Sequence, residues 1–333
     1  MKRLTSYLTL ALGFSLTTAN AQEIKPLRLS GNIGGAGDGK VVYLQRYDNK
    51  LFKTVDSTTV NQGHFQFSTP VPLPELYGLS LDTNAFPLQV FLEDAPITVT
   101  FDADGSPSSA AIVGSAAQQQ FEDFRKRQRT LTAKDFINED PSSIVAAYAL
   151  FRVYSYNLSP AEIREHLQLL DPALDGSQYV QILNGLAAKQ EDVLPGNKAI
   201  DFSSTDPEGN PVRFSDYLGK DYVLLDFWAA WCGPCRKENP NIVAAFNKYK
   251  DSGFNVFGVS LDKDKASWVN AINDDGLHWP QVSDLAFWDT EAPALYGVRF
   301  IPSNLLIDPN GVIVARNIKG EDLHRTLEEI FGH

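Results

Sequence analysis

The two cysteines of this chain, Cys232 and Cys235, are its only ones, and they follow directly on an apolar run. That run, residues 222–227, is nearly continuous, which is typical of a central strand buried on both faces. Pro234 predicts the first turn of a helix, because its ring presets a helical φ and it lacks an N–H that would have no partner there. The stretch therefore predicts a buried strand, a short turn and a helix that begins with both sulfur atoms on one side.

This placement favours redox chemistry at the cysteine pair. The N-terminus of a helix leaves N–H groups unpaired and carries a partial positive charge, and both favour a thiolate at Cys232. We therefore expect Cys232 to attack a disulfide of a partner and Cys235 to resolve the resulting mixed disulfide. Gly233 has no side chain, so it leaves room for the partner to approach.

Two other interpretations of the pair are a zinc site and a structural disulfide. A structural zinc site needs four ligands, but the chain has no further cysteine and its five histidines show no ligand spacing. A structural disulfide more often joins distant segments. A Cys-x-x-Cys motif after a strand is typical of redox proteins, so we expect a redox-active disulfide with no metal and no cofactor.

The residues around the pair resemble a known family. Residues 226–235 read Asp-Phe-Trp-Ala-Ala-Trp-Cys-Gly-Pro-Cys, which looks like the thioredoxin active site. From about Gly196 to its end the chain is similar to the TlpA/ResA-like thiol–disulfide oxidoreductases. The resemblance includes Ala-Ile-Asp-Phe at 199–202, Cys-Arg-Lys-Glu-Asn-Pro at 235–240 and Gly-Val-Arg-Phe-Ile-Pro at 297–302. The family usually has proline where Ile200 stands. The resemblance implies an α/β thioredoxin-like domain with a central insertion at residues 263–298.

Two acidic residues gain candidate roles from this resemblance. Asp226 lies within the apolar strand, where burial should raise its pKa. The resemblance implies that it takes and returns the proton of Cys235; the alternative is an acid satisfied by local hydrogen bonds. Glu238 lies one helical turn after Cys235, and the resemblance implies that it tunes the site. The alternative is a surface glutamate paired with a neighbouring lysine or arginine.

The groove for a substrate is also suggested by the resemblance. In the thioredoxin fold the proline at position 302 is cis and lies beside the cysteine pair, whereas an ordinary trans proline at a strand start is the alternative. Because Pro302 has no N–H, the backbone of Ile301 is left for an extended substrate to bind. We expect the groove to be formed by Trp231, Gly233, Pro234, Ile301 and Pro302.

The rest of the 333-residue chain divides into three further parts by its pattern. Residues 1–21 are interpreted as a cleaved signal peptide, with Lys2 and Arg3, an apolar run and the small-residue site at 19–21; an uncleaved anchor is the alternative. Residues 22–114 predict a small all-β domain, a sandwich or open barrel, from short β-rich runs at 40–46, 63–68, 77–82, 88–92 and 97–102. Residues 115–193 predict a helical region, and residues 194–333 the thioredoxin-like domain.

Three local patterns in the N-terminal half need an interpretation. Residues 34–40 resemble a phosphate-binding loop, but Val41 stands where serine or threonine should hold magnesium, so we expect a hairpin loop instead. In the helical region, Asp140-Pro141 predicts one helix start and the capping box of Ser159 and Glu162 another. The aromatic stripe that follows residue 144 is expected to be core rather than a ligand site. The basic run 125–129 is expected to be a solvated helix face, with contact to an acidic partner as the alternative.

The expected function is a periplasmic thiol–disulfide oxidoreductase that reduces protein disulfides. The formal charge of −12 argues against nucleic acid as a partner. The Gly-Pro pair between the cysteines favours a reductant, as does the resemblance. The expected partners are disulfide-containing envelope proteins, with an apocytochrome c as one candidate, and a membrane-bound thiol electron donor. The alternatives are a disulfide oxidant or isomerase with the same residues, an envelope binding or chaperone-like protein acting through its N-terminal half, and a thiol peroxidase.

Overall fold

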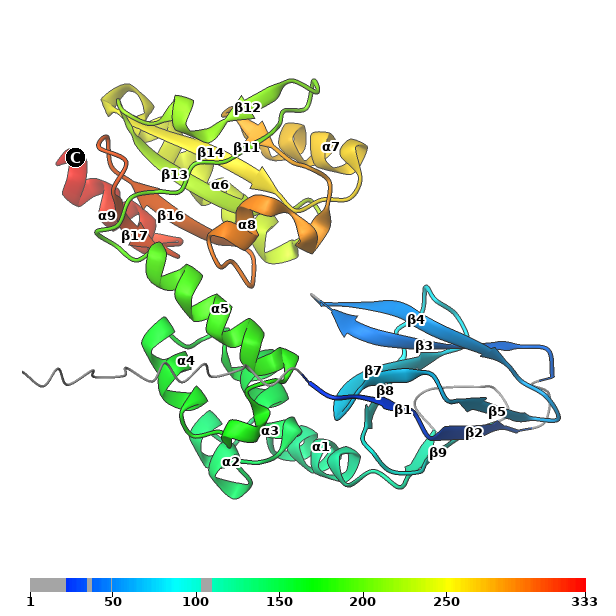
Figure 1. Cartoon of the computed structure of the whole chain (residues 1–333). Helices are drawn as coiled ribbons and strands as arrows, with labels where there is room; N and C mark the ends of the chain where they lie inside the picture. Colours follow the sequence, from blue (N-terminus) through cyan, green and yellow to red (C-terminus); the bar gives the residue numbers. More distant parts are fainter. Residues whose placement is uncertain (1–21, 35–37, 49, 103–109) are drawn as a thin grey trace, which may run out of the picture.

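The structure is a computed structural model that describes residues 22–34, 38–48, 50–102 and 110–333. The predicted signal peptide, residues 1–21, lies outside the described residues. Figure 1 shows a β-rich part, a helical part and a C-terminal α/β part in chain order. The described residues up to 113 form the β-rich part. Helix α5 leads from the helical part into the C-terminal part.

A five-stranded mixed sheet forms the centre of the C-terminal domain, in the order β15-β14-β13-β16-β17. Strand β13 pairs with β14 in parallel and with β16 antiparallel, so it is the middle strand. Six of its seven residues are buried, as the apolar run predicts for a strand covered on both faces. The strands are β13 (Tyr222–Trp228), β14 (Phe254–Ser260), β15 (Gln281–Val282), β16 (Ser303–Ile307) and β17 (Ile313–Arg316).

Helices and a hairpin complete this domain. Helix α6 begins at Gly233 directly after the turn that follows β13, and it packs against α7, α9 and β14. The order of elements is that of the thioredoxin fold, which confirms the predicted fold class of this domain. The remaining elements are the hairpin β11 (Ser203–Thr205) and β12 (Pro211–Arg213), and helices α6 (Gly233–Tyr249), α7 (Lys265–Asp275), α8 (Glu291–Leu295) and α9 (Glu321–Phe331).

Two four-stranded sheets form the N-terminal β domain, which is the sandwich among the predicted alternatives. Their inward side chains make one apolar core, which includes Leu29 and Phe67 from the first sheet and Leu44 and Leu79 from the second. The first sheet has the order β10 (Ala111–Val113), β9 (Ile97–Phe101), β2 (Leu29–Ile33), β5 (His64–Phe67). The second has the order β4 (Leu51–Thr59), β3 (Val41–Asp48), β7 (Glu75–Ser80), β8 (Leu88–Leu92), and β1 (Ile24–Pro26) pairs with β6 (Pro70–Pro72).

The structure of this domain differs from the sequence prediction in two places. The segment 34–40 does not close a hairpin, because β2 and β3 belong to different sheets; residues 35–37 of it lie outside the described part. Strand β4 was not predicted, since its sequence is rich in threonine, serine and charge. It is an edge strand, and edge strands carry polar side chains because no neighbour covers them.

Strand β7 joins the β domain to the helical part. All six of its residues are buried, because one face lies in the sandwich core and the other under helices. Tyr77 and Leu79 pack into the sandwich, whereas Leu76 packs with Phe121 and Tyr148 of the helical part. The expected aromatic stripe is thus core: Tyr148 and Phe151 are both buried there.

Each of the five helices in this part begins at a serine or threonine whose side chain accepts a backbone N–H. The capping box of Ser159 and Glu162 is confirmed. The start predicted at Asp140-Pro141 is wrong: Ser143 caps the helix at the N–H of Val145, and Asp140 instead closes the preceding turn. The helices are α1 (Ala116–Arg127), α2 (Ala133–Glu139), α3 (Ile144–Ala149), continued by a π-helical turn (Leu150–Tyr154), α4 (Pro160–Leu167) and α5 (Gln178–Asp192).

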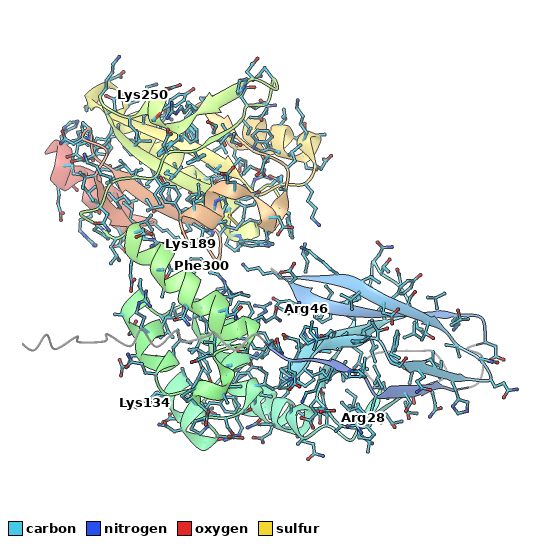
Figure 2. The ribbon with its side chains drawn as sticks, viewed as in Figure 1. Arg28, Arg46, Lys134, Lys189, Lys250 and Phe300 are labelled. Carbon is cyan, nitrogen blue, oxygen red and sulfur yellow. A yellow bond between two sulfur atoms is a disulfide. The ribbon has the colours of Figure 1, made fainter. Side chains whose placement is uncertain are left out.

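The end of α5 packs closely against the C-terminal domain, at the junction where Figure 2 labels Lys189 and Phe300. Gly297 has a left-handed φ of 59°, and a Cβ atom there would lie 2.7 Å from the side chain of Gln190. The Gln190 side-chain amide donates to the carbonyl oxygen of Gly297 at 3.0 Å. The positive φ and the close approach both favour glycine at this position.

A buried hydrogen bond connects the β domain to α5 and generates the first prediction. Tyr179 donates its hydroxyl to the fully buried carboxyl of Glu75, and the N–H of Leu76 donates to the Tyr179 oxygen at 3.2 Å. Tyr179→Phe leaves the Glu75 carboxyl without this donor, so we expect the free energy of unfolding to fall by about 1–3 kcal/mol in urea titrations. Tyr217→Phe is the control, with an expected change within about 0.5 kcal/mol, because Tyr217 is half-buried in ring contact with Phe257. Equal losses in both variants would contradict the assignment.

Candidate active site

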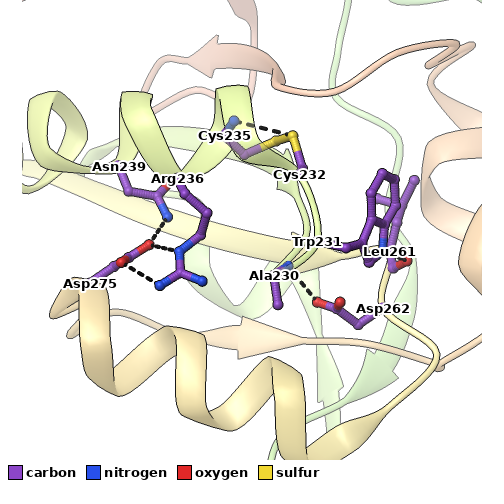
Figure 3. The surroundings of a disulfide bond; sticks show 9 residues. All are labelled: Ala230, Trp231, Cys232, Cys235, Arg236, Asn239, Leu261, Asp262 and Asp275. Carbon is purple, nitrogen blue, oxygen red and sulfur yellow. Dashed lines mark hydrogen bonds and ion pairs between the residues drawn. A yellow bond between two sulfur atoms is a disulfide. The ribbon is translucent and has the colours of Figure 1, made fainter.

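The cysteine pair lies where β13 leaves the sheet and α6 begins (Figure 3). The two sulfurs are joined in a disulfide of 1.98 Å. Cys232 is the N-cap residue of α6, and its sulfur accepts the backbone N–H of Cys235 at 3.1 Å. The sulfur at the helix N-terminus thus has a backbone donor and the positive end of the helix dipole beside it, and both stabilise negative charge.

Access to the disulfide comes from the side of the two residues between the cysteines. Cys235 is fully buried and Cys232 is 4% exposed, whereas Gly233 and Pro234 are exposed. Apart from its chain neighbours and the backbone of its own helix, no atom lies within 4 Å of the place where a Cβ would stand on Gly233. A partner sulfur can therefore reach Cys232 over Gly233, while Cys235 is reached only from Cys232.

The turn before Cys232 is fixed by residues that the motif did not indicate. The carboxylate of Asp262, which is buried, accepts the N–H of Ala230 at 2.9 Å and the hydroxyl of Ser260 at 2.7 Å. The indole N–H of Trp231 donates to the carbonyl of Leu261 at 3.2 Å, as Figure 3 shows. Only its position could have indicated Asp262 in advance. It follows β14, the strand parallel to β13, and the carboxyl ends of parallel strands lie at the same end of a sheet.

An ion pair on the other side of the cysteines holds α6 against α7. Arg236 makes two hydrogen bonds to Asp275, at 2.5 and 2.8 Å, and Asn239 donates to the same carboxylate at 2.6 Å. A two-pronged arginine–carboxylate contact fixes geometry more strictly than a single hydrogen bond. No local pattern in the sequence indicated Asp275 as the partner.

Asp226 lies inside the sheet at 3% exposure. Its pKa is raised from 3.8 to about 7, mainly by burial and then by the nearby charge of Glu238, while Lys319 acts in the opposite direction. Its Oδ1 atom is buried without a hydrogen-bond partner among the described residues. Burial in this strand therefore raises the pKa of Asp226, as the sequence predicts.

Glu238 is half-buried one turn after Cys235, and its contacts are not those of a glutamate paired with a surface cation. Its Oε1 accepts the backbone N–H of Gly320 at 2.7 Å, and its Oε2 accepts the side-chain amide of Asn241 at 3.2 Å. Lys319 lies within electrostatic reach of both acids, and burial lowers its pKa. Asp226, Glu238 and Lys319 thus interact electrostatically with one another. Lys319, which comes from the loop before α9, has no motif that could have revealed it.

The predicted groove residues lie at the end of the central sheet where β13 stops. The Ile301–Pro302 peptide bond is cis, as the resemblance implies. Ser303, the next residue, is paired with Phe227 near the end of β13. Pro302 therefore lies at the end of the sheet from which β13 leads to the cysteines. Ile301 packs against the apolar core that contains both cysteines.

An aromatic rim, which we define as Trp231, Phe287 and Trp288, borders the groove. Trp231 is 47% exposed, and its ring centroid lies 5.1 Å from that of Phe287 and 6.1 Å from that of Trp288. Leu285 and Phe287 have φ values of 57° and 60°, a strained region for residues other than glycine. Beside the rim lies a cleft of about 450 Å³ lined by Trp231, Phe287, Lys263 and Asp262 among others. Phe287 and Trp288 belong to the central insertion, and sequence reasoning missed them.

Two further properties bear on the chemistry. In residues 22–34, 38–48, 50–102 and 110–333, no group of three or more histidine, cysteine, aspartate or glutamate side chains is placed to hold a metal ion. In the same ranges no helix is both long enough and apolar enough to cross a membrane.

Comparison with family models gives two matches. Residues 195–316 match the AhpC/TSA family, and residues 27–121 match a domain of unknown function, DUF4369. The two matches correspond to the C-terminal domain and to the β domain with part of α1.

Named relatives match the C-terminal part. The thiol–disulfide oxidoreductase ResA of Bacillus cereus is 33% identical over 156 residues, which are 47% of this chain and 87% of that protein. ResA of Geobacillus kaustophilus is 36% identical over 141 residues, 41% of this chain and 79% of that protein. Less than half of this chain is thus covered by either relative.

Solved structures also match part of this chain. The thioredoxin domain of a thiol–disulfide oxidoreductase from Bacteroides vulgatus is 37% identical, with 41% of this chain and 98% of that chain covered and a TM-score of 0.39. A thiol–disulfide oxidoreductase from Bacteroides fragilis is 34% identical, with 40% and 99% covered and a TM-score of 0.38.

The buried acid generates a prediction on pH. Because the pKa of Asp226 is near 7 in the folded protein and near 4 in the unfolded chain, the folded state binds more protons between these values. Its contribution to stability is full below pH 4, and the free energy of unfolding should fall by up to about 4 kcal/mol as the pH rises to 7. Asp226→Asn should flatten this fall in urea titrations of the disulfide form at pH 5 and pH 8. Parallel pH curves for the two proteins would show that Asp226 titrates normally.

Proposed function

Because the chain belongs to the ResA-like thiol–disulfide oxidoreductases, we propose that it reduces disulfide bonds of proteins outside the cytoplasm, in a periplasm. In the proposed cycle the Cys232 thiolate attacks one sulfur of the substrate disulfide, and the other substrate sulfur leaves as a thiolate that takes a proton. Cys235 then gives up its proton and attacks the Cys232 sulfur. The first substrate sulfur leaves Cys232 as a thiolate and takes up a proton, so the substrate departs as a dithiol. The two electrons that reduce it come from the cysteine pair, which is oxidised to the Cys232–Cys235 disulfide.

The observation that carries this proposal is the position of Cys232 at the N-terminus of α6. There its sulfur accepts the N–H of Cys235 and lies at the positive end of the helix. Both effects lower the pKa of a thiol, so the thiolate is available as nucleophile and as leaving group near neutral pH. Cys235 is fully buried, which suits a thiol that reacts only with its neighbour.

For Asp226 we propose the role of proton acceptor and donor for Cys235. A carboxyl group with a pKa of about 7 can take up a proton and return it near neutral pH with little cost in either direction. Glu238 is proposed to tune this group, since its negative charge raises the pKa of Asp226. Neither role requires a cofactor or a metal, and we propose that the enzyme uses only its cysteine pair.

The direction of the reaction and the partners complete the proposal. The Gly-Pro pair between the cysteines, the same pair as in thioredoxin, supports a reductant. A reductant outside the cytoplasm needs electrons, and we propose a membrane-bound thiol protein as donor and disulfide-containing envelope proteins as substrates, with an apocytochrome c as one candidate. The signal peptide interpreted at residues 1–21 supports export.

The reduction potential tests the proposed direction. We expect the Cys232–Cys235 couple to equilibrate near or below about −270 mV in a graded dithiol buffer, read by thiol trapping, as for thioredoxin. A value near about −120 mV would instead identify a disulfide oxidant. Cys235→Ala should accumulate a mixed disulfide with a disulfide-bearing peptide, and Cys232→Ala should form none. Rapid turnover of hydrogen peroxide by the wild type would favour the thiol peroxidase alternative.

The role of Asp226 has a kinetic test. Asp226→Asn cannot exchange a proton with Cys235, so release of the mixed disulfide should slow by about 10²–10⁴-fold, the usual contribution of a positioned acid or base. The first attack by Cys232 should stay nearly unchanged. Stopped-flow measurement separates the two steps, and Asp251→Asn, the same change at an exposed aspartate beyond the end of α6, is the control. Equal slowing of both steps in Asp226→Asn would contradict the assignment.

A further inference from the structure

The turn between β3 and β4 brings one lysine from the N-terminal domain to the border of the substrate groove. The amine of Lys50 donates a hydrogen bond to the carbonyl oxygen of Arg299, which lies 249 residues later in the chain. The same nitrogen lies 3.2 Å from the ring centroid of Trp288 and 5.5 Å from that of Tyr156. One side chain of the β domain therefore contacts two separate segments of the thioredoxin-like domain.

The backbone at this turn makes a lysine an unexpected residue. Asp48 pairs with Leu51, so the loop between the strands has two residues, and Lys50 adopts a φ of 70°. Turns of this kind favour glycine at that position, because a side chain is strained at positive φ. The chain thus carries a long side chain at a place where the local structure favours none, and that side chain reaches across the domain junction.

Both segments that Lys50 contacts adjoin residues of the predicted groove. Trp288 is part of the aromatic rim beside Trp231, the residue before the nucleophilic cysteine. Arg299 lies two residues before Ile301 and three before the cis proline. Lys50 therefore connects the segment of the aromatic rim to the segment that leads to the cis proline.

Further contacts from the N-terminal half hold the same two segments. The guanidinium of Arg299 donates to the carbonyl of Phe151 at 3.2 Å and stacks on the Phe151 ring at 4.4 Å. Lys53, on the same hairpin as Lys50, lies 3.7 Å from the carboxylate of Asp289, the residue after Trp288. Together with the close packing of α5 at Gly297, these contacts fix where the groove segments stand.

The charge state of Lys50 bears on how it holds them. Burial lowers its pKa to about 6, and the neighbouring cations Arg299 and Arg152 act in the same direction. The face of the Trp288 ring acts in the opposite direction, since it stabilises an ammonium group. The hydrogen bond to Arg299 does not depend on the outcome, because a neutral amine still has N–H groups to donate.

We propose that Lys50 is a positioning residue through which the N-terminal β domain sets the substrate groove of the redox site, so that the extension determines how well a polypeptide disulfide binds. The proposal rests on the proposed function. Lys50 does not touch the cysteines, so it acts on the binding of an extended chain and leaves the thiol chemistry unchanged. Small disulfides, which need only Cys232, do not use the groove walls.

Two substitutions of Lys50 test this in the mature full-length protein. Lys50→Gly relieves the positive φ, so the urea midpoint should stay equal or rise, and Lys50→Met keeps the apolar stem without the amine. In both, KM for a disulfide-bearing peptide should rise by about 2- to 10-fold at unchanged kcat, the range expected for losing one hydrogen bond, here the one to Arg299. The reduction potential and the rate with 2-hydroxyethyl disulfide should match the wild type.

Lys40→Met is the matched control, because Lys40 is exposed before the other end of β3. It should leave both substrates unaffected. An unchanged peptide KM in the two Lys50 variants overturns the inference, and so does an equal loss with 2-hydroxyethyl disulfide. If the wild type forms peptide disulfides instead of reducing them, the peptide KM of each Lys50 variant is compared with that of the wild type in the oxidising reaction. A wild type that turns over neither substrate refutes the proposed function itself, which is a different result.

Discussion

The N–H of Cys235 that points at the sulfur of Cys232 is the interaction on which the rest of the site depends. It exists only because α6 begins at Gly233, and α6 begins there because β13 ends in the turn that Asp262 holds. The central strand is buried on both faces and cannot shift without exposing its apolar residues. The rigid sheet thus places the Cys232 sulfur at a helix N-terminus near the surface. The second sulfur is buried, so it is reached only from Cys232.

Asp226, Glu238 and Lys319 interact electrostatically, and the burial of Asp226 has a cost that the fold must offset. A carboxyl group inside an apolar strand is expensive as an anion, which is why the pKa of Asp226 rises to about 7. The neighbours adjust it in both directions: Glu238 favours the protonated form and Lys319 the ionised form. Because Glu238 is fixed by the N–H of Gly320, its distance to Asp226 depends on the loop before α9. The electrostatic environment of Asp226 is thereby tied to an element far from the motif in sequence.

The N-terminal half packs against segments next to the cysteine site. The thioredoxin-like domain contains both cysteines, but the segments that border them, 287–289 and 297–302, contact the β3–β4 turn, Phe151 and α5. The strained turn at Phe287 and the strained turn at Lys50 meet through Trp288. Strain at two facing turns is tolerated where the surrounding contacts over-determine the backbone.

The sequence by itself determined what depends on neighbours along the chain. The apolar run before Cys232, the Cys-Gly-Pro-Cys spacing and the Ser159–Glu162 capping box predicted the central strand, the redox helix and a helix start, because strand burial and helix capping are set within a few residues. The helix start at Asp140 failed, since Ser143 competes for the same role three residues later. Only the tertiary structure decided that Asp262 holds the turn, that Lys319 lies near Asp226, and that Lys50 and Trp288 border the groove. Those contacts join residues tens to hundreds of positions apart, and no local pattern encodes which distant side chain will fill a given gap.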